Sequence, residues 1–284
     1  MKILFISYSD GGGGAAKAIL NLYKSFNDNI KNKLLVIDKR EKNKKIKLYH
    51  SGILGKIYRK IRYLIAQSIF LNQKFYVMSL NLINSGLSNY INNSVYDIVN
   101  FHWINCETIS ISEIKKINKP IVWTLHDMWP ISGIYHYDLD KKYFNSELGS
   151  NMKKVYFNYL DDLTKKRKQI LYKEKKIHLV SPSKWLLEKA KKTKLPFGKM
   201  EVIPNPINIS IYKKKNDIMS LKKKYNIPTN KKIILYSSLK LDDKRKGFNI
   251  IKKTIKDKKF NNQVFIFFGI SSYLDKSKFS ENII

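Results

Sequence analysis

The sequence predicts an α/β fold in which a mostly parallel sheet is covered by helices. Two observations support this: short β-branched or aromatic runs alternate with segments of helical spacing, and polar residues or glycines follow the runs at their carboxyl ends. In such sheets ligands bind beyond the carboxyl ends of the strands, so we expect the functional residues there. The expected strands of the first part of the chain are residues 3–7, 33–37, 97–101, 121–125 and 177–180.

The first expected strand leads into a loop of four consecutive glycines. These are Gly11, Gly12, Gly13 and Gly14, and helical spacing begins at residue 15. Glycines let main-chain N–H groups approach a ligand closely, and the first turn of a helix offers unpaired donors with a partial positive charge. The loop therefore predicts a site for a phosphate or phosphosugar, although it matches neither GxGxxG nor a GK[ST] ending. A plain flexible turn is the alternative.

Length, composition and charge narrow the class of protein. The 284 residues, 43% of them hydrophobic, allow one large or two modest domains and argue against disorder. The net charge of +33 comes mainly from lysine, with arginine at five positions. Two interpretations are open: compositional drift, and a basic surface for phospholipid headgroups or lipid-linked phosphates. Scarce arginine and the lack of a zinc-finger, RNP or helix-turn-helix signature predict no nucleic-acid partner.

The single cysteine, Cys106, excludes an internal disulfide and a cysteine-rich zinc site. No spacing of metal ligands stands out, so we expect neither a metal nor a cofactor. The apolar run at the N-terminus is too short for a signal peptide, and no stretch reaches the roughly 20 apolar residues that span a bilayer. The sequence predicts a cytoplasmic protein, with contact at the inner face of the membrane left open.

Two prolines separate the first part of the chain from a second α/β segment. Residues 202–206 read Val-Ile-Pro-Asn-Pro, and we place a boundary there between a first domain, 1–205, and a second, 206–284. In the second domain we expect strands at 232–237 and 263–268 around a helix at 248–258. Two strands and one helix cannot bury a sheet on both faces, so we expect this domain to be incomplete.

Residues 53–70 have the pattern of a basic amphipathic helix. Apolar residues from Ile53 to Ile69 follow helical spacing, and Lys56, Arg59, Lys60 and Arg62 occupy other positions. Such a helix can lie on an anionic membrane. It can equally pack its apolar stripe on the sheet and leave its lysines in solvent, which is the plainer interpretation.

Four stretches carry a family resemblance. They are the glycine loop, residues 100–103 (NFHW), residues 123–130 (WTLHDMWP) with their continuation to residue 137, and residues 240–248 (KLDDKRKGF). Together they resemble the GT-B-fold glycosyltransferases of family 4, in particular the bacterial branch that builds surface polysaccharides. HDMWP is the most specific of these motifs, and residues 204–206 are similar to the linker between the two domains of that family.

The resemblance implies a GT-B fold, with a Rossmann-like N-terminal domain and an incomplete Rossmann-like C-terminal domain. It implies a retaining hexosyltransferase that moves a sugar from a nucleoside-diphosphate-sugar to a saccharide or lipid-linked acceptor, in surface polysaccharide or lipopolysaccharide biosynthesis. The donor would bind mainly to the second domain and the acceptor mainly to the first. Cations near the donor would stabilise the charge that its diphosphate gains as it leaves.

The resemblance also assigns roles to individual residues. It implies His126 and Asp127 as catalytic residues; Gly11, Gly12, Gly13, Gly14, Lys240, Arg245 and Lys246 at the donor or a phosphate; and His102, Trp103, Trp129, His136 and Tyr137 at the acceptor. Each has a structural alternative: a polar group satisfied at a strand end, a ring that stabilises its loop, or a solvated lysine.

The chain departs from the family pattern near its end. Members carry an acidic motif of two glutamates beyond the second strand of the C-terminal domain, and it does not occur here. We therefore expect a truncated chain, with a complementing C-terminal fragment as one possible partner. A truncated, inactive binding or scaffold protein is the main alternative function, and a basic nucleic-acid-binding protein is a weaker one.

Overall fold

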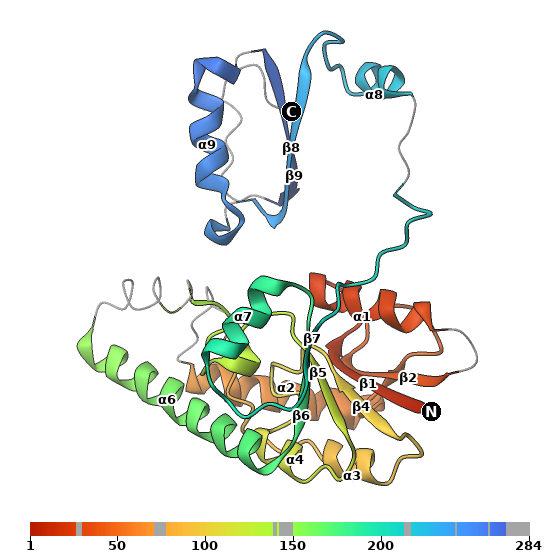
Figure 1. Cartoon of the computed structure of the whole chain (residues 1–284), viewed down its shortest axis with the longest axis vertical. Helices are drawn as coiled ribbons and strands as arrows, with labels where there is room; N and C mark the ends of the chain where they lie inside the picture. Colours follow the sequence, from red (N-terminus) through yellow and green to blue (C-terminus); the bar gives the residue numbers. More distant parts are fainter. Residues whose placement is uncertain are drawn as a thin grey trace. The chain divides into compact units, whose positions relative to one another are not determined.

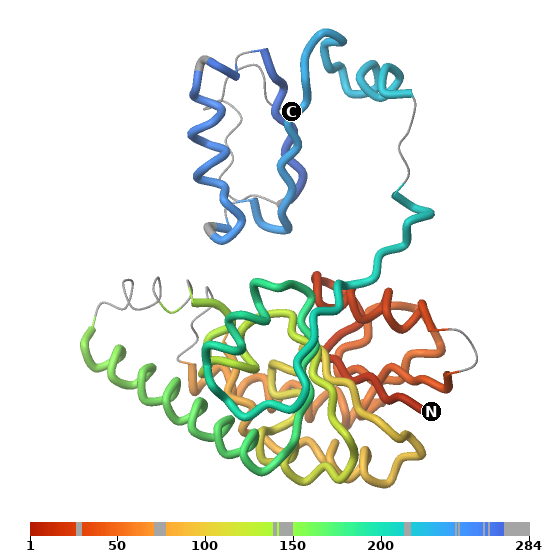
Figure 2. The backbone as a smooth tube through the Cα atoms, viewed as in Figure 1, coloured from red at the N-terminus to blue at the C-terminus, as the bar shows by residue number. Residues whose placement is uncertain are grey.

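The computed structural model describes residues 1–26, 30–70, 78–138, 141, 150–212, 217–241, 243–260 and 262–270. The chain divides into two compact units, Met1–Asn208 and Ile209–Ile284. Figures 1 and 2 show the helices, strands and chain course of each unit. Each unit is described by itself.

A seven-stranded sheet forms the centre of the first unit. Its strands are β1 (Lys2–Ser9), β2 (Lys31–Asp38), β3 (Lys47–Leu48), β4 (Ile98–Phe101), β5 (Ile121–Thr124), β6 (Ile177–Ser181) and β7 (Met200–Val202). They are ordered β3-β2-β1-β4-β5-β6-β7, and every neighbouring pair is parallel. The predicted parallel sheet is confirmed, with all five expected strands in place. The very short β3 and β7 were not predicted.

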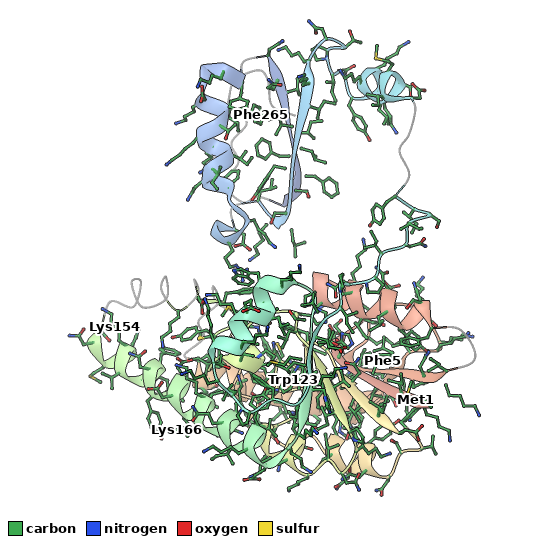
Figure 3. The ribbon with its side chains drawn as sticks, viewed as in Figure 1. Met1, Phe5, Trp123, Lys154, Lys166 and Phe265 are labelled. Atoms are coloured by element: carbon green, nitrogen blue, oxygen red, sulfur yellow. The ribbon has the colours of Figure 1, made fainter. Side chains whose placement is uncertain are left out.

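Helices cover the sheet on both faces, because both sets of alternating side chains in the central strand are apolar. Ile3 and Phe5 of β1 pack in one cluster with residues of α1, whereas Leu4 and Ile6 belong to a second cluster with residues of α3 and α4. Figure 3 shows Phe5 among the side chains of this unit. The helices are α1 (Gly14–Ser25), α2 (Gly52–Ile69), α3 (Leu87–Asn92), α4 (Ile111–Lys115), α6 (Asn151–Glu174) and α7 (Lys184–Lys192).

Helix α2 is present as predicted, but its apolar stripe does not pack on the sheet. Ile53 is 76% exposed and Leu64 is 51% exposed, whereas the buried residues of the helix are Gly55 and Arg62. The interpretation that packs the stripe on the sheet is therefore wrong, although Lys56 and Lys60 are exposed as it predicted. The physical reason is that Arg62 finds backbone acceptors inside the protein, in the carbonyl groups of Ile83 and Glu107.

The second unit contains a two-stranded parallel sheet, β8 (Lys232–Lys240) and β9 (Gln263–Ile270). Helix α9 (Phe248–Lys256) packs its Phe248 against Tyr236 and Phe267 of the strands, and Phe265, labelled in Figure 3, is buried. The described residues of this unit also form a further helix, α8 (Ile218–Lys224), and two short 3-10 turns, η2 (Lys244–Lys246) and η3 (Lys258–Phe260). Asp242 of the KLDDKRKGF motif lies outside the described residues.

Candidate functional site

Polar and aromatic side chains converge at the carboxyl edge of the seven-stranded sheet. The strand order reverses between β1 and β4, and this is the point where open parallel sheets bind their ligands. The glycine loop follows β1, His102 and Trp103 follow β4, and His126 and Asp127 follow β5. Backbone pairing continues past the end of β4, since the amide of Tyr8 in β1 donates to the carbonyl of Trp103 at 3.0 Å. The structure thus brings the predicted strand-end residues together.

Two histidines form a direct pair at this edge. Nδ1 of His102 lies 2.8 Å from Nε2 of His126, so one ring donates its N–H to the other. Burial lowers the pKa of His126 to about 4. Burial, with repulsion from His126, also holds the pKa of His102 well below its usual range. Both rings are therefore neutral at pH 7, and within the described part of the chain Nε2 of the buried His102 has no hydrogen-bond partner.

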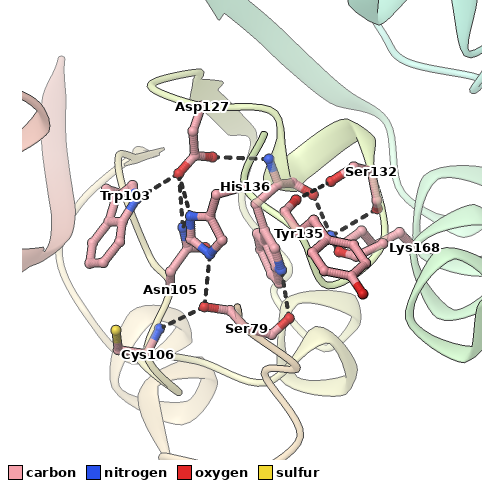
Figure 4. Close-up of polar contacts among 11 residues, drawn as sticks. Ser79, Trp103, Asn105, Cys106, Asp127, Ser132, Tyr135, His136 and Lys168 are labelled. Carbon is pink, nitrogen blue, oxygen red and sulfur yellow. Dashed lines mark hydrogen bonds and ion pairs between the residues drawn. The ribbon is translucent and has the colours of Figure 1, made fainter. Parts of the chain in front are cut away.

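Among the described residues, the carboxylate of Asp127 makes no hydrogen bond with the His126 ring; it binds donors of the surrounding loops instead (Figure 4). Oδ2 accepts hydrogen bonds from Nε1 of Trp103 at 2.7 Å, Nδ1 of His136 at 2.6 Å and Nδ2 of Asn105 at 3.3 Å. Oδ1 accepts from the amide of Trp129 at 3.0 Å. Burial alone would raise the pKa of Asp127, but His136 and the donors around the carboxylate outweigh it and lower that pKa. The carboxylate is therefore ionised, and both of its oxygens accept hydrogen bonds from the surrounding loops.

Besides the buried His102, two more predicted acceptor residues lie inside the protein. Trp129 and His136 are 0% and 1% exposed. Nε1 of Trp129 donates to the carbonyl of Ser79 at 2.7 Å, and Nε2 of His136 lies 3.0 Å from the hydroxyl of the same serine. By contrast, Trp103 and Tyr137 are half-buried. The buried pair supports the loop after β5, and the half-buried pair lies closer to solvent.

Lys168 of α6 also supports this loop, and sequence analysis missed it. Its amino group lies 3.6 Å from the centre of the Trp129 ring, and it donates to the carbonyls of Trp129, Ser132 and Gly133. Three backbone acceptors and an aromatic face take the place of water around the buried amino group, and burial lowers the pKa of Lys168 well below its usual value. A lysine at a helical core position was the signal available in the sequence.

The side chain of Arg40 lies against the glycine loop, and sequence analysis also missed this residue. Gly12 has φ +86°, and a Cβ there would lie 2.0 Å from Nη1 of Arg40. The buried Asp10 fixes the segment after β2, because its Oδ1 accepts from the amide of Arg40 at 2.7 Å. Gly13 precedes α1 without a side-chain cap. The loop thus combines an uncapped helix N-terminus with a neighbouring guanidinium group.

The remaining predicted donor residues belong to the second unit. Lys240 ends β8 and Lys246 lies just before α9, and both are exposed. Arg245 is paired with Asp243 through two side-chain hydrogen bonds of 3.0 and 2.8 Å. Gly247, with φ +77°, precedes α9 without a side-chain cap. All three cations are exposed, and Arg245 is held in an ion pair with Asp243.

Neither a metal centre nor a membrane-spanning helix was found in the described residues. No three or more histidine, cysteine, aspartate or glutamate side chains are grouped there so as to hold a metal ion. Within the same ranges, no helix combines the length and apolar character needed to cross a bilayer.

Comparison with known proteins relates the chain to solved structures only. No protein-family model and no curated protein matches it. Its fold is similar to that of Alr3699/HepE of Anabaena in complex with UDP-glucose, with a TM-score of 0.55 and 14% sequence identity over 100% of this chain and 68% of that one. The complex of the same protein with UDP and glucose gives a TM-score of 0.54, with the same identity and coverage. The likeness confirms the predicted fold class, an α/β GT-B fold with Rossmann-like domains.

Proposed function

We propose that this protein is a glycosyltransferase that moves a sugar from a nucleoside-diphosphate-sugar donor to a saccharide or lipid-linked acceptor. The observation that carries the proposal is the strand-end site, where a neutral histidine pair and a glycine loop meet at the reversal of the strand order. The likeness of the fold to a protein solved with UDP-glucose supports it. The family 4 motifs support the finer proposal of retaining hexosyl transfer in bacterial surface polysaccharide or lipopolysaccharide synthesis.

His126 is the residue that we place beside the reacting sugar. It is half-buried, whereas its partner His102 is buried and fixes the ring through the 2.8 Å contact. A neutral imidazole can donate a hydrogen bond to a sugar hydroxyl or accept one from it, and it adds no positive charge beside the bond that breaks. Asp127 then acts as a positioning residue, because it holds the loop that follows His126.

Phosphate binding falls to backbone amides and lysines in this proposal. The glycine loop offers amide donors for a phosphate of the donor or of the acceptor, and next to it lies Arg40, whose Nε is paired with Asp38 while its Nη1 faces the loop. In the second unit the exposed Lys240 and Lys246 would neutralise the diphosphate as it gains charge. Arg245 contributes less, since its guanidinium group is already paired with Asp243.

Acceptor contacts fall to the half-buried aromatic residues in this proposal. We assign Trp103 and Tyr137 to the acceptor and give the buried Trp129 and His136 supporting roles. Aromatic rings pack well on the apolar faces of sugars, and their polar atoms hydrogen-bond at the rim. We place the reaction in the cytoplasm, at the inner face of the membrane, with no cofactor besides the donor.

The test measures donor turnover by the purified chain. The chain is incubated with a panel of nucleoside-diphosphate-sugars, and released nucleoside diphosphate and donor affinity are measured together. His126→Ala is expected to lower turnover by at least about 100-fold with an unchanged circular dichroism spectrum. His178→Ala, within β6 rather than at its end, is the matched control.

The outcomes separate the two candidate functions. Donor-dependent turnover that requires His126 supports the glycosyltransferase. Donor binding with no turnover by any member of the panel supports an inactive binding protein instead. Turnover that His126→Ala leaves intact removes this residue from the site.

A further inference from the structure

The outward face of α2 is an unusual surface, because its apolar residues are exposed in a row. Ile53, Ile57, Ile61 and Leu64 are spaced four or three residues apart, so they share one face of the helix. Together with Leu54 and Ile65 they range from 44% to 82% exposed. We call these six residues the α2 stripe. Scattered exposed leucines are ordinary, but a continuous stripe on one helix indicates a binding surface.

The inner face of α2 explains why the stripe faces outward. Arg62 is 5% exposed, and its Nη2 donates to the carbonyl of Ile83 at 2.9 Å and to that of Glu107. Gly55 lies against the backbone of His50, since a Cβ at Gly55 would lie 1.8 Å from that carbonyl oxygen. Turning the helix to bury the stripe would expose Arg62 and leave those carbonyls without this partner. The orientation is therefore built into the packing.

The charge of the helix indicates which partner the stripe fits. Its 18 residues contain no aspartate or glutamate. Lys56 and Lys60 are exposed and lie four residues apart, and each is three residues after a stripe residue, Ile53 or Ile57, so it neighbours that residue on the helix surface. A second copy docking through the same face would bring two sets of lysines together. An anionic bilayer instead takes the apolar side chains into its acyl boundary and pairs the lysines with its phosphates.

We propose that α2 docks the protein on the surface of an anionic phospholipid membrane through the α2 stripe, with Lys56 and Lys60 at the level of the headgroups. This inference rests on the proposed location at the membrane, and it does not depend on sugar transfer. Lysine side chains reach from the edge of such a stripe to the headgroups while their stems stay in apolar surroundings.

The first test is sedimentation with vesicles. Vesicles of phosphatidylcholine with about 30% phosphatidylglycerol are compared with pure phosphatidylcholine vesicles at about 0.15 M salt. The protein is expected to bind the anionic vesicles at least about tenfold more tightly. Ile57→Ser/Ile61→Ser/Leu64→Ser should weaken that binding about tenfold or more, because these apolar side chains would no longer enter the bilayer. All three are half exposed, so their replacement should disturb the protein core little.

Matched variants separate this docking from general attraction by a chain of charge +33. Lys56→Gln/Lys60→Gln is expected to weaken binding about tenfold. Lys42→Gln/Lys44→Gln removes the same charge from exposed residues outside α2 and should change it by no more than about twofold. Equal losses in both pairs would overturn the proposal.

A single-site label reports on the helix directly, because Cys106 is the only cysteine. In a Cys106→Ser background, an environment-sensitive dye on Ile61→Cys should shift to the blue on anionic vesicles, whereas the dye on Lys42→Cys should not. No shift at position 61, no vesicle binding, or a concentration-dependent dimer that the serine variant abolishes would overturn the proposal. The last result would assign the stripe to a second copy.

Discussion

The histidine pair should make the stability of the first unit fall on mild acidification. The folded protein holds His126 neutral, with a pKa of about 4 against a usual value of 6.5. As the pH falls below 6.5, His126 binds a proton in the unfolded chain but stays neutral in the folded chain. Stability is therefore fully present above about pH 6.5 and is lost progressively as the pH falls towards 4.

The size of the effect follows from that difference in pKa. At 1.36 kcal/mol per unit, complete loss amounts to about 3 kcal/mol for His126. Between pH 7 and pH 5 the linkage relation gives about 2 kcal/mol. His102 adds to the loss, since its pKa is lowered in the same direction. Asp127 and Asp161, whose pKa values are also lowered, contribute only below about pH 4, outside this window.

The assay is urea unfolding followed by tryptophan fluorescence. All four tryptophans, at positions 103, 123, 129 and 185, lie in the first unit, so the signal reports on that unit alone. The free energy of unfolding is measured at pH 8, 7 and 5 for the protein and for His126→Gln. We expect the variant to lose about 2 kcal/mol less than the protein between pH 7 and 5, with little change for either between pH 8 and 7. Identical losses for both would refute the assignment of a neutral His126 in the folded protein.

Three further predictions concern the glycine loop, the lysine that supports the loop after β5, and the second unit. Gly12→Ala should lower the free energy of unfolding by about 1 to 2 kcal/mol, because the positive φ of Gly12 strains any residue that carries a Cβ, whereas Gly14→Ala, with no positive φ and open space around it, should cost less; urea titrations that rank them equally would contradict this. Lys168→Met should cost about 3 kcal/mol in the same measurement, because three buried carbonyls lose their donor, and an unchanged midpoint would show that they find other partners. Lys246→Ala should weaken donor binding about tenfold by calorimetry, whereas the exposed Lys253 of α9 serves as a control whose alanine variant should bind as before; equal affinities for both would remove Lys246 from the donor site.

Local patterns were sufficient to predict most of the strands and their functional ends. Apolar β-branched runs such as residues 121–125 carry their own signal, and parallel pairing brings their carboxyl ends together, so the proximity of His102 and His126 was accessible from sequence. The strands β3 and β7 are only two and three residues long and were too short to give such a signal. Their pairing depends on the neighbouring strands.

Other features depend on contacts between distant segments. The spacing of α2 gave its apolar stripe correctly, but the inward orientation of Arg62 depends on carbonyl groups at Ile83 and Glu107, far along the chain. Arg40 likewise reaches the glycine loop only because β2 lies beside β1. Neither contact has a periodic pattern that sequence analysis could detect.

Lys168 links a long helix mechanically to the edge where we place the chemistry. Its amino group donates hydrogen bonds from α6 to backbone carbonyls of residues 129–133. A few residues further along the chain, the ring of His136 is hydrogen-bonded to the Asp127 carboxylate. Because these hydrogen bonds join the helix to the loop, we expect α6 and the loop after β5 to move together. A displacement of the helix would then also move the loop that follows His126.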